Sequence, residues 1–188
     1  MPLPRNSCRS GEFLLQKVEN QAICDAFDCG RDDLNEYFHM DSIPHRSQLL
    51  TQSYCLQDIT KMGEAIALLD FCNDSIKLKD YEEVIALPQT KRHSSLPAVK
   101  LTRFGVRKDL IHRHIGTYAL NMVKAFFVTE NRTGCRFITV DSYVDVVGFY
   151  EKNNFKLLTN QDTRKDTRTM VFDLKFFVLD ASFDFSIG

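Results

Sequence analysis

Short apolar runs and longer amphipathic runs follow one another along this chain, and their spacing predicts interspersed strands and helices. Runs rich in β-branched and aromatic residues predict strands at residues 12–18, 49–59, 63–73, 98–106, 135–143, 155–159 and 167–176. Apolar positions three and four residues apart predict helices at residues 27–38, 78–87, 114–131 and 146–153, with another short helix before residues 44–46. The short loop "TKMG" between the second and third strands predicts an antiparallel hairpin, and "PQTKRHSSLP" predicts an exposed basic loop.

The clearest predicted helix covers residues 114–131. One apolar stripe runs along it, formed by Ile115, Ala119, Met122, Val123, Phe126 and Phe127. Strands that are joined partly by a hairpin and partly through helices predict an α+β or mixed α/β fold, with helices on both faces of the sheet. We expect one domain over residues 1–188 with a core at about 12–176. The apolar tail, residues 177–188, is expected to dock on this body or on a partner.

Composition adds little except exclusions. Hydrophobic residues make up 44% and charged residues 26% of the chain, which is ordinary for a globular protein. No run approaches 18 consecutive apolar residues, and "MPLPRNSCRSGEF" lacks the apolar core of a secretion signal. We therefore expect no membrane span and a cytoplasmic location. None of the six cysteines belongs to a C-x-x-C pair, so we expect reduced, buried thiols.

Positive charge gathers before the longest predicted helix, although the net charge is only −1. Residues 91–115 contain seven Lys or Arg residues, three histidines and a single acid, Asp109. Within them, "LIHRHIGT" (residues 110–117) joins a strand to that helix. Because a helix N-terminus presents free N–H groups and partial positive charge, such a loop can bind a phosphate. It carries one glycine, however, so an anion site and an ordinary basic turn remain alternatives.

A second notable stretch, "FYEKNNF" (residues 149–155), closes a helix and starts a strand. The pair Asn153–Asn154 suits a helix end, because Asn tolerates the left-handed conformation found there. Tyr150 in this stretch can be a general acid for a departing thiolate, since a phenol has an unperturbed pKa of about 10. The alternative for Tyr150 is an ordinary half-buried tyrosine.

These two stretches and "FDCGRDDLNEYF" (residues 27–38) together resemble the GNAT superfamily of N-acetyltransferases over about residues 13–174. The segment 27–38 is similar to one branch that includes the acetyltransferase toxins of toxin–antitoxin modules, which acetylate aminoacyl-tRNA. The resemblance implies a central mixed, mostly antiparallel sheet of six to seven strands with helices on both faces. It also implies acetyl-CoA (coenzyme A) as cosubstrate.

The resemblance also implies roles for individual positions. The backbone of Phe104, Gly105 and Val106 would bind the pantetheine arm like an extra strand. The loop that opens the long helix would hold the diphosphate, and it comprises Ile111, His112, Arg113, His114, Ile115, Gly116 and Thr117. Tyr150 would protonate the departing thiolate, whereas no residue can be named as the base, for which water or a carboxylate could serve. Ile111 stands where the family has Gln or Arg, and His114 where it has a glycine, which hinders close backbone approach if residue 114 is left-handed.

Two functions follow from these patterns. The first is an acetyl-CoA-dependent N-acetyltransferase whose acceptor is a small-molecule or protein amine. Transfer to tRNA is not favoured by a pI near 6.5. The alternative is a non-catalytic GNAT-fold module that has lost coenzyme A and recognises a partner, which the altered loop and the apolar tail favour. The sequence permits a homodimer, and the H-x-H pair of His112 and His114 lacks the third ligand that a metal site needs.

Overall fold

The computed structural model describes residues 6–77, 93–129, 133–159, 166–177 and 185–187. Within them the strands form one nine-stranded sheet in the order β7-β8-β6-β5-β4-β3-β2-β1-β9. The strands are β1 (Cys8–Ser10), β2 (Phe13–Lys17), β3 (Gln52–Asp58), β4 (Ala67–Lys77), β5 (Ser95–Val106), β6 (Phe137–Tyr143), β7 (Lys156–Leu157), β8 (Thr167–Asp173) and β9 (Ser186–Ile187). All neighbours pair antiparallel except β5 and β6, which run parallel. The α+β class and the mostly antiparallel sheet expected from the sequence are confirmed.

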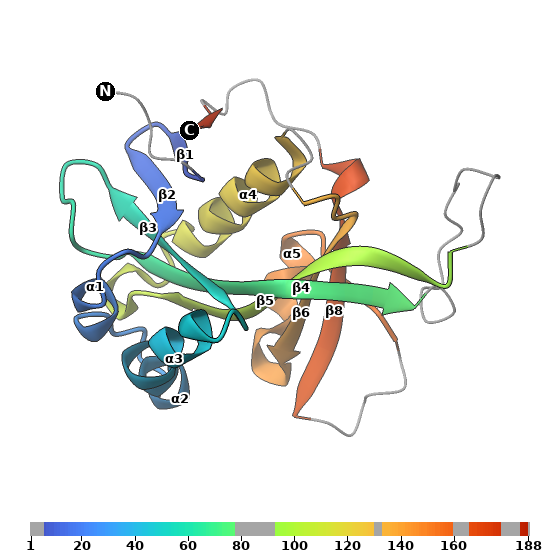
Figure 1. The fold of residues 1–188 in the computed structure, drawn as a ribbon, viewed down its shortest axis with the longest axis horizontal. Helices are drawn as coiled ribbons and strands as arrows, with labels where there is room; N and C mark the ends of the chain where they lie inside the picture. The colour runs from blue at the N-terminus through green and yellow to red at the C-terminus, as the bar shows by residue number, and fades with distance from the viewer. Residues whose placement is uncertain (1–5, 78–92, 130–132, 160–165, 178–184, 188) are drawn as a thin grey trace.

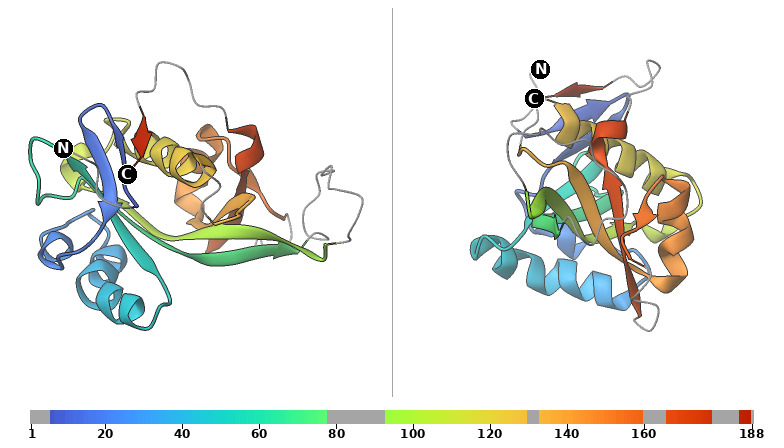
Figure 2. Two further views of the ribbon diagram at one scale, coloured as in Figure 1. Left: turned by 45° about the horizontal axis from the view of Figure 1, so that its top comes forward. Right: turned by 90° about the vertical axis from the view of Figure 1, so that its right-hand side faces the viewer.

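Helices cover both faces of this sheet (Figure 1). One face carries α1 (Ala22–Asp25), α2 (Asp32–Glu36), a π-helical turn (Tyr37–Asp41) and α3 (Ser42–Ser47). The opposite face carries α4 (Ile115–Val128) and α5 (Val147–Lys152), as the two views in Figure 2 also show. Each layer has its own apolar core, so the sheet is buried on both sides over its central strands.

The predicted apolar stripe of the long helix is confirmed in α4. Ala119, Met122 and Val123 are fully buried against the sheet, and Phe126 meets the aromatic side chain of Tyr54. The helix ends at Val128 rather than at the expected residue 131. The backbone is already extended at Thr129. The Thr129 main-chain N–H and the Thr129 hydroxyl both donate to the Ala125 carbonyl, the hydroxyl at 2.8 Å.

Strands β5 and β6 pair over only part of their lengths. Their parallel register joins Ala98–Leu101 to Phe137–Val140, although both strands continue beyond it. Past Leu101, the edge of β5 that faces β6 has no strand partner among the described residues, while its other edge stays paired with β4 up to Val106. The sheet therefore opens between these two strands.

A β-bulge explains why β5 leaves β6 at this point. Asp70 pairs with Arg103 and Phe71 with Leu101, which leaves Thr102 as an extra residue on β5. The Thr102 hydroxyl donates to the Asp70 carbonyl at 3.0 Å and fixes the bulge. A bulge bends its strand and increases its local twist, so β5 turns away from β6 directly after the last shared pair.

Several boundaries differ from the sequence expectations. The sheet is wider than six to seven strands because β1 and β9 extend it, and β9 docks the end of the tail antiparallel to β1. The basic loop expected over residues 88–97 is partly wrong, since β5 already begins at Ser95. Pro44 lies inside α3 rather than after a helix. Because a proline has no N–H, Pro44 cannot donate the backbone hydrogen bond of a regular helix. The π-helical turn directly precedes this irregular helix. The helix predicted at 78–87 lies outside the described residues.

Candidate active site

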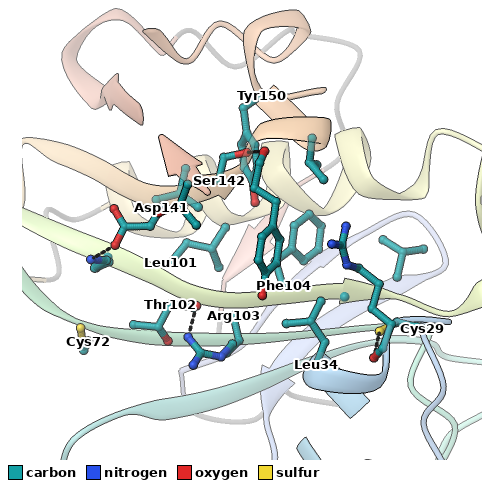
Figure 3. Close-up of a pocket in the computed structure, with 18 of the residues that line it drawn as sticks. Cys29, Leu34, Cys72, Leu101, Thr102, Arg103, Phe104, Asp141, Ser142 and Tyr150 are labelled. Carbon is teal, nitrogen blue, oxygen red and sulfur yellow. Dashed lines mark hydrogen bonds and ion pairs between the residues drawn. The ribbon is translucent and has the colours of Figure 1, made fainter. Parts of the chain in front are cut away.

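Two adjoining cavities lie where the sheet opens. The first, which we call the loop cavity, lies between the start of α4 and helix α5 and has a volume of about 750 Å³. The second, the sheet cavity, lies between the diverging parts of β5 and β6 and has a volume of about 650 Å³. They meet at the residues that line both, namely Arg31, Phe104, Val106, Ile111, Val146 and Tyr150. Figure 3 shows Tyr150 on one side of β5, with Leu34 and Arg103 on the other side, around the sheet cavity.

Nearly all of the loop and strand residues singled out in the sequence come together here. The loop cavity is lined by Phe104, Val106, Ile111, His112, His114, Ile115, Gly116, Thr117 and Tyr150. Gly105 lines the sheet cavity. Arg113 differs, because its side chain lines a separate small hollow beside Arg107 and its N–H donates to the Leu110 carbonyl at 3.3 Å.

The loop before α4 has an unusual backbone conformation. His112 has φ +66° and His114, the N-cap of α4, has φ +60° and ψ +9°, so both are left-handed. A residue with a Cβ pays about 1–2 kcal/mol for this conformation, and such strain gathers at functional sites. The loop thus keeps, with histidine, a backbone geometry that glycine would adopt freely.

The first turn of α4 lies at the loop cavity, which Ile115, Gly116 and Thr117 line. The first helical bond of α4 runs from the Tyr118 N–H to the His114 carbonyl at 3.0 Å. The N–H groups of residues 115–117 precede it in the first turn and have no carbonyl of their own helix to bind. They carry the positive end of the helix dipole, which favours an anion at that place.

Two glycines lie in close packing around the cavities. A Cβ on Gly116 would come within 3.1 Å of the Phe149 ring of α5, so glycine lets the start of α4 approach that ring. A Cβ on Gly105 would come within 3.1 Å of the Cys29 Cβ and 3.2 Å of the Phe27 ring. Gly105 therefore lets the segment before α2 pack directly on β5.

Tyr150 lies on α5 and lines both cavities. It is buried, and this burial raises the pKa of its phenol well above the ordinary value. Its ring is fixed by edge contacts with Phe149 and Phe155 at centroid distances of 5.1 and 5.4 Å. The phenol is therefore protonated at neutral pH.

A group of residues that the sequence did not reveal spans the edge of both cavities. Arg31, before α2, binds Asp145 at 3.0 Å, and its guanidinium carbon lies 4.4 Å from the centroid of the Tyr143 ring. The Tyr143 hydroxyl donates to Asp33, and this bond raises the pKa of Tyr143. Arg31 and Asp145 are 114 positions apart. We call Arg31, Asp33, Tyr143 and Asp145 together the clasp. The clasp joins α2 to the turn before α5.

Two cysteines also line the sheet cavity, Cys29 and Cys72. Burial raises the pKa of the Cys29 and Cys72 thiols, so neither is a thiolate at neutral pH. Among the described residues, the carboxylates lining the two cavities are Asp141, which pairs with Lys100, and Asp145, which pairs with Arg31. No group of three or more potential metal ligands occurs in the described part of the chain, and none of its helices could cross a membrane.

Comparison with known proteins gives the fold a name. No protein-family model and no curated sequence matches the chain. Solved structures do match. A bacterial toxin aligns with a TM-score of 0.70 at 16% identity, covering 86% of this chain and 91% of that chain. The complex AtaTR bound with AcCoA aligns with a TM-score of 0.67 at 17% identity, covering 87% and 95%.

A third match is AtaT complexed with acetyl-methionyl-tRNAfMet, with a TM-score of 0.65 at 16% identity, covering 87% and 95% of the two chains. At these identities the likeness is one of fold. The chain has the GNAT fold seen in acetyltransferase toxins of toxin–antitoxin modules, as its sequence motifs predicted.

Proposed function

We propose that this chain is an acetyl-CoA-dependent N-acetyltransferase in which a primary amine attacks the acetyl thioester directly. One observation carries the proposal: a left-handed loop opens a long helix onto a cavity that continues along an unpaired strand edge to a buried, protonated phenol. In this order, the loop fits the diphosphate of acetyl-CoA, the strand edge fits its extended amide-containing arm, and the phenol lies where the thioester would be. The cavity favours an acetyltransferase over the alternative function, a non-catalytic module that has lost coenzyme A.

In this proposal the chain supplies binding and one proton. The N–H groups of residues 115–117 hold the diphosphate, and Gly116 lets this first turn of α4 pack against the Phe149 ring. The free edge of β5 at residues 104–106 pairs with the pantetheine arm. The bound cosubstrate supplies an acetyl thioester. As the N–C bond forms and the C–S bond breaks, Tyr150 gives its proton to the departing sulfur and regains one from water.

The sheet cavity is the proposed place of the acceptor amine. Its cysteine thiols are protonated, which supports direct attack rather than an acetylated cysteine. Asp141 and Asp145 are both ion-paired, so water is the proposed receiver of the amine proton. Because AtaT has been solved with acetyl-methionyl-tRNAfMet, a charged tRNA belongs among the acceptors to test, beside protein and small-molecule amines.

The test measures coenzyme A thiol release from acetyl-CoA with three acceptors: methionyl-tRNA, a peptide with a free N-terminus, and spermidine. Mass spectrometry identifies the acetylated product. Tyr150→Phe should reduce kcat by about 100-fold or more while leaving the Kd for acetyl-CoA unchanged. Tyr118→Phe is the matched control, since that phenol binds the Ser10 carbonyl outside both cavities. Full turnover by Tyr150→Phe would remove the acid assignment, and absence of acetyl-CoA binding by the wild type would remove the proposed function.

A further inference from the structure

A lysine lies among the buried residues of α4, beside its apolar stripe, where a charge is not expected. Lys124 is 2% exposed and sits between Val123 and Ala125, which are also buried. It forms no ion pair with any carboxylate in the described part of the chain. Because an unpaired ammonium loses its hydration on burial, other contacts must offset that loss.

The surroundings of Lys124 are aromatic. Its Nζ lies 4.1 Å from the centroid of the Phe172 ring, 5.4 Å from that of Phe155 and 5.9 Å from that of Phe177. Ring faces attract a cation, most strongly when water is excluded. These contacts offset part of the desolvation of the ammonium and hold the side chain in one place.

The Nζ also donates a hydrogen bond to the backbone carbonyl of Asn153 at 2.7 Å. Asn153 ends helix α5, and its side-chain Nδ2 donates to the Phe149 carbonyl at 2.8 Å. The main-chain N–H groups of Asn153 and Phe155 both donate to the Tyr150 carbonyl at 3.0 Å. Asn153 therefore connects Lys124 to the residue that carries the proposed acid.

A second route joins the same two residues. Lys124 packs on the Phe155 ring, and the Phe155 ring makes an edge contact with the Tyr150 ring. Since α5 has only six residues, its own hydrogen bonds hold it weakly, and external contacts set its orientation. Lys124 thus ties α4, which begins at the loop cavity, to the short helix that presents Tyr150.

We infer that Lys124 is a positioning residue for Tyr150, which it holds through the Asn153 carbonyl and the Phe155 ring so that the phenol meets the departing thiolate. The inference rests on the proposed function. A purely structural lysine would affect folding, and would not separate turnover from cosubstrate binding.

The first experiment compares Lys124→Met, which removes the donor and the charge, with Lys124→Gln, which keeps an N–H donor. Lys124→Met should lower kcat by about 10-fold, because a small displacement of a catalytic group reduces its efficiency, while the Kd for acetyl-CoA stays within about twofold. Lys124→Gln should recover part of the loss. The matched control is Phe126→Leu, a buried α4 substitution facing Tyr54 and not α5. It should lower stability and leave kcat unchanged.

A second readout does not depend on turnover. In protein labelled with ¹³Cζ-tyrosine, the Tyr150 resonance, assigned from Tyr150→Phe, should shift in Lys124→Met and stay in place in Phe126→Leu. If the wild type does not bind acetyl-CoA, the proposed function fails, and this shift still tests the positioning. An unchanged Tyr150 resonance, or an equal loss of kcat in Phe126→Leu, would overturn the inference.

Discussion

The buried ammonium of Lys124 leads to a quantitative prediction about stability and pH. Burial lowers the pKa of Lys124 from 10.5 to about 8 in the folded chain. In the unfolded chain the side chain is hydrated and its pKa returns to about 10.4. Between these two values the unfolded state binds the proton and the folded state does not. The free energy of unfolding attributable to Lys124 therefore rises with pH in this window.

The size of the effect follows from the difference between the two pKa values. A shift of about 2.5 units corresponds to about 3 kcal/mol, since one unit corresponds to about 1.4 kcal/mol. The Lys124→Met variant has no titrating group at this position. The difference in free energy of unfolding between the wild type and this variant therefore reports the titration of Lys124, because the contributions of all other titrating groups cancel. As the pH rises from 7 to 10.5, the wild type should gain about 3 kcal/mol of stability relative to Lys124→Met. Below about pH 8 the difference between the two proteins should be constant.

Urea denaturation of both proteins at several pH values between 7 and 10.5 measures this difference directly. Unfolding is followed by far-ultraviolet circular dichroism, because the chain contains no tryptophan. The reasoning predicts a relative slope that appears near pH 8 and approaches about 1.4 kcal/mol per pH unit. A difference that does not change with pH would mean that Lys124 keeps its ordinary pKa. A relative slope of opposite sign would mean that the folded protein stabilises its charge.

Three further predictions concern single positions. Gly116→Ala should weaken acetyl-CoA binding by about 10-fold in calorimetry, because the new Cβ meets the Phe149 ring at 3.1 Å; undiminished affinity would contradict this. Tyr37→Phe should lower the free energy of unfolding by about 2 kcal/mol, because the fully buried Asp70 loses the phenol that donates to it at 2.7 Å; a loss below about 0.5 kcal/mol would be contrary evidence. His114→Gly should raise the free energy of unfolding by about 1 kcal/mol by relieving a left-handed residue, and an unchanged value would show no strain.

The sequence predicted the parts of the fold that depend on local patterns. The hairpin of β3 and β4 forms in the expected order because each strand has an apolar face that the sheet buries. The stripe of α4 faces the core because its spacing matches the helical repeat. The bounds of these elements were less predictable, since β4 and β5 continue along each other to Lys77 and Ser95 through pairing that no local pattern records.

The site was predictable where its residues are neighbours in the sequence. The loop that contains His114 and Gly116 lines the same cavity as Tyr150, as the motifs suggested. The left-handed conformation of His114 could not be read from a histidine, because most histidines avoid it. The clasp between Arg31 and Asp145 was also invisible, since only the folded sheet brings those positions together.

Lys124 shows a different limit of sequence reasoning. A charged residue within an apolar stripe usually marks the solvent-facing border of a helix, and a long side chain can reach water from there. Here the surrounding rings close over it, and only the three-dimensional packing reveals the burial. A conflict between pattern and burial of this kind often marks a functional position.

The central claim is that main-chain N–H groups at the start of α4 still hold a diphosphate although His114 stands where a glycine is usual. Amide proton NMR of ¹⁵N-labelled protein during titration with acetyl-CoA tests it most directly. The amide protons of Ile115, Gly116 and Thr117 should show saturable downfield shifts, since these groups would donate to phosphate oxygens. Saturating acetyl-CoA that leaves these three resonances unmoved would contradict it.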